Sequence, residues 1–342
     1  MILLIVKKVA SNIFYYFLDF LTLTGFGYVF WIMMGKMLPP EQYGILFSVV
    51  SLFYILVVVS TLGMYESLPK FISENKKNPG SVIKFSMNLS IAFSLALSAF
   101  IYIFSNNISE YFYGCSSMTH PLQFLSSILF FGTMFYITKA VLQGLKDFKH
   151  MFYGEIISNT VKIIIAFFLV YIGLNALGGA IAWAAWFLIA ALIFSSFITK
   201  HFSSGAKFNK KRFMHYSFLS MVSLISFYVI FQGGIILLGV MSSMTSAALM
   251  GVAFLFGQLV MALPSIVMGA IYPHLSDFWP KHKEKFTKLF SIAIKFVVIT
   301  TLPIMILFMV FASDLINILY TPNICQRQKY SQHSFSGLFL QA

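Results

Sequence analysis

The stretch IIIAFFLVYIGLNALGGAIAWAAWFLIAALIFSSFIT, residues 163–199, contains no Asp, Glu, Lys or Arg. It is too long for a single membrane-spanning helix, which needs about 20 mostly apolar residues. The segment GLNALGG, residues 173–179, interrupts it with residues that favour a turn. The stretch therefore predicts two transmembrane helices, at about residues 152–173 and 177–198, joined by a short uncharged loop.

The composition of the whole chain also indicates a membrane protein. Of its 342 residues, 59% are apolar and 10% are charged, whereas about 25% of the residues in an ordinary globular chain are charged. The mean hydropathy is +0.86. So little polar surface cannot cover a water-soluble particle. Because the apolar runs are too long for barrel strands, we expect an all-α, polytopic membrane protein.

The same pattern recurs along the chain and predicts nine transmembrane helices. Polar or turn-forming segments, such as LPPEQ at residues 38–42 and ENKKNPG at residues 74–80, separate the apolar runs. The expected spans are residues 12–35, 43–63, 82–104, 121–143, 152–173, 177–198, 216–239, 247–272 and 289–311.

The basic residues define an orientation. Eighteen of the 23 Lys and Arg residues fall on the side of the N-terminus, whereas the loops on the opposite side contain only Lys36. Cytoplasmic loops carry an excess of Lys and Arg. We therefore expect a cytoplasmic N-terminus and a multi-pass protein of the cytoplasmic membrane. The bias also accounts for the net charge of +13 without a nucleic-acid partner.

Metal, disulfide and cofactor chemistry have no sequence signal. Cys115 and Cys325 are far apart in the chain, and the seven histidines show neither HxxxH nor HExxH spacing. We expect no metal site and no cofactor.

Four segments carry a family resemblance. They are GKMLPPEQYGILFSVVSL (35–52), LGMYESLPKFISE (62–74), VLQGLKDFK (141–149) and YPHLSDFWPKHKEKFTKLF (272–290). Together they resemble the polysaccharide-export branch of the MOP superfamily, the O-antigen and exopolysaccharide flippases that are related to the MATE antiporters. The resemblance covers roughly residues 9–322.

The resemblance implies a function. Such proteins move an oligosaccharide, linked through a diphosphate to a polyprenol lipid, from the cytoplasmic to the outer leaflet by alternating access. No bond is made or broken, so the resemblance implies a transporter and not an enzyme. The implied partners are the lipid-linked oligosaccharide, membrane lipids and other proteins of polysaccharide assembly.

The resemblance also implies a MATE-like architecture of two six-helix lobes. We expect a first lobe at residues 1–200, a cytoplasmic loop at residues 201–215 and a partial second lobe of three helices at residues 216–322. Residues 323–342 differ from the family pattern, and we interpret them as an atypical tail produced by a frameshift or truncation.

Ionisable residues inside the spans are the candidates for function, because such groups are costly in a membrane. A diphosphate that enters a region of low dielectric needs cations, and Lys can bind phosphate as a point charge. Lys162 and Lys139 are the first candidates for this role, and Lys295 is the third. Glu155 lies seven positions before Lys162, so the two share a helix face.

Other roles are open for these residues. Lys139 and Lys295 lie near the ends of their spans and could extend to the cytoplasmic interface. Asp19 and Glu155 are candidates either for proton or sodium coupling or for pairing with one of the lysines.

Two other functions compete with the flippase. A MATE-type drug or metabolite antiporter driven by Na⁺ or H⁺ would make use of Asp19. A membrane polysaccharide polymerase is less favoured, because the outer loops are short and contain only Lys36, Glu41 and Glu110 as charged residues.

Overall fold

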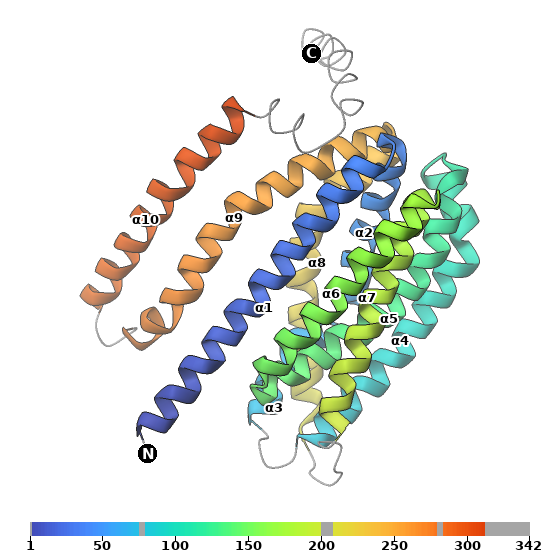
Figure 1. The fold of residues 1–342 in the computed structure, drawn as a ribbon. Coiled ribbons are helices and arrows are strands. Elements are labelled where there is room, and N and C mark those ends of the chain that lie inside the picture. Colours follow the sequence, from blue (N-terminus) through green and yellow to red (C-terminus); the bar gives the residue numbers. More distant parts are fainter. Residues whose placement is uncertain (1, 75–78, 200–207, 279–282, 312–342) are drawn as a thin grey trace. The chain divides into compact units, whose positions relative to one another are not determined.

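The computed structural model describes residues 2–74, 79–199, 208–278 and 283–311 (Figure 1). These ranges are helical almost throughout. A π-helical turn, η1 (Ile108–Phe112), and a 3-10 turn, η2 (Ser116–Met118), separate two of the α-helices. In chain order the α-helices are α1 (Ile2–Met37), α2 (Pro40–Ser60), α3 (Met64–Glu74), α4 (Gly80–Asn107), α5 (Thr119–Leu145), α6 (Phe148–Tyr171), α7 (Asn175–Ile198), α8 (Lys210–Met241), α9 (Met244–Phe278) and α10 (Lys283–Val310).

Nine helical segments in the described part of the chain are long and apolar enough to cross a membrane. They correspond one to one with the spans expected from the sequence, and most of their ends differ by a few residues. Helix α9 extends from Met244 to Phe278 and contains the whole of the expected span at residues 247–272. The predicted all-α, polytopic fold is therefore confirmed.

Helix α3 is not predicted by the hydropathy pattern. Its 11 residues are too few for a span, and Glu66, Pro69 and Lys70 interrupt the apolar pattern. The helix forms because its apolar positions are spaced three and four apart and so lie on one face. This face packs against α5 and α8. Its buried residues are Met64, Ser67, Leu68, Phe71 and Ile72.

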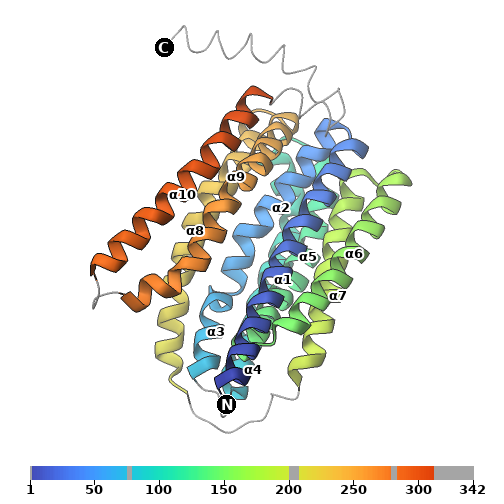
Figure 2. The same ribbon diagram turned by 60° about the vertical axis from the view of Figure 1, so that its left-hand side comes forward.

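The chain forms two compact units, Met1–Ala248 and Leu249–Ala342. In the first unit α5 packs on α4 and α7, α7 packs on α6, and α1 lies along α6 (Figure 1). Helix α2 packs against α5, α7 and α8 (Figure 2). In the second unit Phe256 and Phe308 pack with ring centroids 5.5 Å apart. The two-lobe division stays a prediction, and the tail at residues 323–342 lies outside the described residues.

The core of the first unit is aromatic where α1, α2 and α7 meet. Phe30, Trp31, Phe47, Phe53 and Trp183 are all buried. The rings of Trp31 and Phe47 stack with centroids 3.9 Å apart and planes 2° from parallel. Each well-placed aromatic pair contributes about 0.5–1.5 kcal/mol beyond its buried area. This packing holds α1 against the bundle and positions the polar side chains on its inner face.

Gly63 allows close packing between the turn after α2 and helix α8. Its φ is +65°, a conformation that favours glycine. A Cβ at this position would lie 2.4 Å from the carbonyl oxygen of Ser217. We therefore expect Gly63→Ala to destabilise the protein by about 1–3 kcal/mol, as is typical of overpacking. The thermal unfolding midpoint of the purified protein in detergent measures this effect.

Gly114 provides the matched control for this prediction. Its φ is +56°, but a Cβ there would have no neighbour within 4 Å. Gly114→Ala therefore has a similar backbone cost without a steric clash, and we expect a smaller decrease in the midpoint. Equal decreases for the two variants would contradict the packing explanation.

Candidate functional site

One face of α6 carries polar side chains into the interior of the first unit. Glu155, Asn159 and Lys162 are spaced four and three positions apart, so they lie on the same face of the helix. Glu155 and Asn159 are fully buried, and Lys162 is 2% exposed. Glu155 and Lys162 thus share a face, as their spacing predicts.

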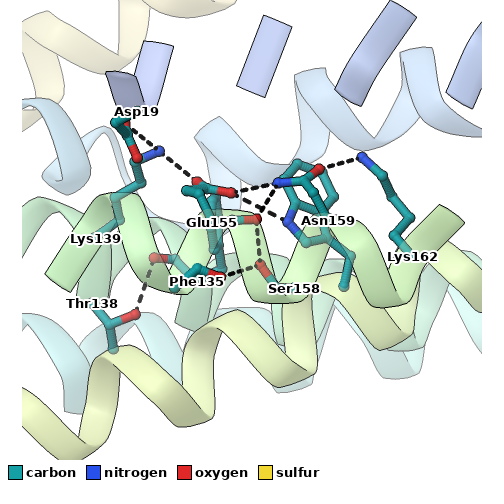
Figure 3. A network of polar contacts seen from close by, with 10 residues as sticks. Asp19, Phe135, Thr138, Lys139, Glu155, Ser158, Asn159 and Lys162 are labelled. Carbon is teal, nitrogen blue, oxygen red and sulfur yellow. Dashed lines mark hydrogen bonds and ion pairs between the residues drawn. The ribbon is translucent and has the colours of Figure 1, made fainter. Parts of the chain in front are cut away.

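Lys139 of α5 connects this face to α1 (Figure 3). Its Nζ atom lies 2.5 Å from Oε1 of Glu155 and 3.1 Å from Oδ2 of Asp19. The three side chains come from three different helices, and each is at least four-fifths buried. A single lysine therefore pairs with two carboxylates and joins α1, α5 and α6.

The second oxygen of Glu155 continues the network along α6. Asn159 donates from Nδ2 to Oε2 of Glu155 over 2.8 Å, and the indole nitrogen of Trp186 lies 3.4 Å from the same oxygen. Lys162 donates from Nζ to Oδ1 of Asn159 over 2.7 Å. Asn159 therefore relays the contact between the carboxylate and the second lysine.

Lys162 lies in an aromatic enclosure. Its Nζ atom is 3.9 Å from the ring centroid of Trp186, 5.4 Å from that of Trp183 and 5.5 Å from that of Phe30. Aromatic faces attract cations within about 6 Å, and the attraction increases when the cation is removed from water. Rings from α1 and α7 therefore stabilise the ammonium group and also cover it.

The charges of this group, which we call the polar network, are formally balanced. The polar network consists of Asp19, Lys139, Glu155, Asn159 and Lys162. Its two carboxylates and two ammonium groups sum to zero when all are ionised. Removing an ion from water costs several kcal/mol, and a buried partner with good geometry offsets that cost. A proton, cation or anion that enters the polar network would change this charge balance and so weaken or strengthen the ion pairs that join α1, α5 and α6.

Asp19 has one oxygen that the polar network does not use. Its Oδ1 atom is buried and has no hydrogen-bond partner among the residues that the structure describes. Buried polar atoms are normally hydrogen-bonded, so such an atom requires an explanation. A water molecule or a cation would each supply the missing interaction.

Most of the chain matches a known protein family. Residues 33–324 match the model of a family described as polysaccharide biosynthesis protein. The chain belongs to this family. The match covers most of the chain and includes every residue of the polar network except Asp19. No curated protein sequence matches the chain.

Solved structures confirm the MATE-like fold of this polysaccharide biosynthesis family member. An inward-facing multidrug resistance transporter of the MATE family in the MOP superfamily aligns with a TM-score of 0.64 and 15% identity, over 88% of this chain and 74% of its own. The MATE multidrug transporter DinF-BH, solved as a complex, gives the same TM-score and identity over 91% of this chain and 74% of its own. At this identity the similarity concerns the fold alone.

The structure brings together four of the five site residues predicted from the sequence. Lys139, Lys162, Asp19 and Glu155 form one polar network, and Asp19 pairs with a lysine. Lys295 lies on α10 in the other compact unit and is exposed.

Two members of the site are not predicted from the sequence. Asn159 lies between the charged positions of α6, and its helical spacing from Glu155 and Lys162 is the signal that could have identified it. Trp186 has no comparable signal, because it reaches Glu155 only through the packing of α7 on α6. Within the described ranges, no group of three or more His, Cys, Asp or Glu side chains could hold a metal ion.

Proposed function

We propose that this polysaccharide biosynthesis protein moves a polyprenyl-diphosphate-linked oligosaccharide from the cytoplasmic to the outer leaflet of the cytoplasmic membrane by alternating access. The family match and the MATE-like fold support a membrane transporter that handles a polysaccharide precursor. In this role the protein binds and releases its cargo without changing a bond, so it is not an enzyme. The observation that carries the proposal is a buried lysine among the spans, Lys162.

Lys162 is the residue that we assign to the diphosphate. Its hydrogen-bond partner is an amide oxygen, and no described carboxylate lies within ion-pair distance of it. A diphosphate would supply a direct anionic partner for Lys162, and the lysine would offset the cost of desolvating it. Because Lys162 is 2% exposed, α1 with Phe30 must move before a cargo can reach it. Alternating access provides such a movement.

The other charged residues have supporting roles in this proposal. Lys139 already pairs with Asp19 and Glu155, so we assign it to holding α1 against the bundle rather than to direct diphosphate binding. Lys295 stays a separate candidate, because an exposed lysine on α10 is also well placed to reach the membrane interface.

A second candidate function is an antiporter driven by Na⁺ or H⁺. The observation that favours it is the Oδ1 atom of Asp19, which has no partner among the described residues and which a sodium ion would satisfy. The similar solved structures are multidrug transporters. In the antiporter, the ion would weaken the contact between Asp19 and Lys139 and so couple ion binding to the position of α1.

Transport by the purified protein in proteoliposomes distinguishes the two functions. The first probe is undecaprenyl diphosphate carrying an oligosaccharide, whose arrival in the outer leaflet is detected with an external lectin. The second is a fluorescent organic cation driven by a pH or sodium gradient. We expect movement of the lipid-linked oligosaccharide. Gradient-driven cation transport that requires Asp19, without movement of the lipid, would assign the antiporter, and movement of neither probe would overturn the proposal.

A further inference from the structure

Four tyrosines from four helices meet in the first unit. We call Tyr54 (α2), Tyr65 (α3), Tyr136 (α5) and Tyr228 (α8) the tyrosine cluster. The rings of Tyr54 and Tyr228 stack with centroids 5.5 Å apart and planes 15° from parallel. The rings of Tyr65 and Tyr136 are 5.1 Å apart, and Tyr65 forms a side-chain hydrogen bond with Tyr228. Each residue of the cluster therefore contacts at least one other member.

The hydroxyl groups distinguish these four positions from most aromatic positions of the chain. The chain contains 40 Phe and 17 Tyr, so phenylalanine is its usual aromatic residue. Tyr54, Tyr136 and Tyr228 lie within candidate spans, where a phenol hydroxyl has a desolvation cost that a phenylalanine ring avoids. All four rings are half-buried rather than sealed in the core. Phenylalanine at these positions would keep the aromatic packing but would not offer the hydroxyl groups.

The surroundings of the tyrosine cluster contain an unused polar group. Trp183 lies edge-on to Tyr54 with ring centroids 6.1 Å apart. Its indole nitrogen is buried and has no hydrogen-bond partner in the described part of the chain. One turn before Tyr54, Ser51 donates to Gln232 of α8 over 2.9 Å. The contact between α2 and α8 is therefore polar as well as aromatic, although both helices are apolar overall.

We propose that the tyrosine cluster is the binding surface for the sugar part of the transported lipid. This inference rests on the proposed function and adds the residues that recognise the glycan. A sugar ring presents an apolar face of C–H groups and a rim of hydroxyl groups. A half-buried tyrosine offers the complementary pair, an aromatic face and a phenol hydroxyl. Four tyrosines supply several such contacts without a charge.

The location of the cluster suits a transporter. Tyr54, Tyr65 and Tyr136 belong to the predicted first lobe, whereas Tyr228 belongs to the first helix of the predicted second lobe. A glycan on this surface would contact both predicted lobes. Trp183 also contacts Lys162, so the sugar surface and the proposed diphosphate ligand share a neighbour. The order of sugar and diphosphate on the protein would then match their covalent order in the lipid.

Binding to the purified protein in detergent tests this assignment. The two probes are undecaprenyl diphosphate carrying a hexose trisaccharide and the same lipid without sugar, and the Kd of each is measured by thermophoresis. We expect the wild type to bind the glycosylated lipid more tightly. Tyr228→Leu should weaken that binding about tenfold, the effect of losing one good aromatic contact, and leave the bare lipid unaffected. Tyr228→Phe keeps the ring, so its Kd for the glycosylated lipid should lie between those of the wild type and Tyr228→Leu.

Tyr171→Leu is the matched control, because Tyr171 is 77% exposed at the end of α6 and should contribute nothing. An equal loss of affinity for both lipids would show that Tyr228 only supports the fold, and a wild type that does not distinguish the lipids would exclude sugar recognition. Tighter binding of a planar organic cation would assign the cluster to a drug antiporter. Failure of the proposed function is a different result, namely absence of lipid movement in proteoliposomes.

Discussion

Glu155→Ala is expected to destabilise the protein by about 3–5 kcal/mol, the usual cost of removing one partner from a buried ion pair. Lys139 would lose its 2.5 Å contact and keep only Asp19 as a counter-charge. Asn159 and Trp186 would lose the carboxylate oxygen to which they donate. The measurement is the thermal unfolding midpoint of the purified variant in detergent, converted to a free energy with the measured unfolding enthalpy.

Two controls separate the charge from the hydrogen bonds. Glu155→Gln keeps an amide oxygen for Asn159 and Trp186 but removes the charge. It should therefore lower the unfolding midpoint less than Glu155→Ala does. Adding Lys139→Met to Glu155→Gln removes the counter-charge of Asp19 as well, so the double variant should be less stable than Glu155→Gln. Glu110→Gln, at an exposed position, should have almost no effect. A Glu155→Ala midpoint equal to that of the wild type would show that the polar network does not stabilise the fold.

The sequence predicts the spans well because transmembrane helices obey a local rule. Each must contain enough consecutive apolar residues to cross the bilayer, and the uncharged interval at residues 163–199 shows this directly. Helix α3 is missed because its stability depends on packing against α5 and α8, which no hydropathy window contains. Tertiary contacts, rather than local composition, determine such short helices.

The candidate site was only partly predictable for the same reason. The shared face of Glu155 and Lys162 follows from helical periodicity. The contact between Asp19 and Lys139 depends on how α1 lies along α6 and how α5 approaches both, and a single sequence does not contain that information. Charge alone placed Lys295 with the other lysines, whereas the structure places it in the other compact unit. The tyrosine cluster joins four helices and has no pattern in the sequence.

Lys162→Met is expected to reduce movement of the lipid-linked oligosaccharide about thirtyfold or more, while the protein remains folded. Removing one partner of a desolvated charged contact costs about 2–5 kcal/mol of binding, and each 1.4 kcal/mol corresponds to a factor of ten. The structural cost should be smaller than that of Glu155→Ala, because the side chain has one hydrogen bond, to Asn159, and Met would fit among Trp186, Trp183 and Phe30. Initial rates in proteoliposomes and the unfolding midpoint are measured on the same preparations.

Lys295, on α10, provides the matched control for this prediction. Lys295→Met removes a charge of the same type from another candidate span, but at an exposed position. If Lys162 binds the diphosphate, Lys295→Met should keep most of the transport rate, and Lys162→Met should also lose affinity for undecaprenyl diphosphate without sugar. That second loss distinguishes Lys162 from Tyr228, whose substitution should affect only the glycosylated lipid. Lys162→Met with normal transport would show that the buried ammonium group serves only the polar network, and the cargo would then need another cation.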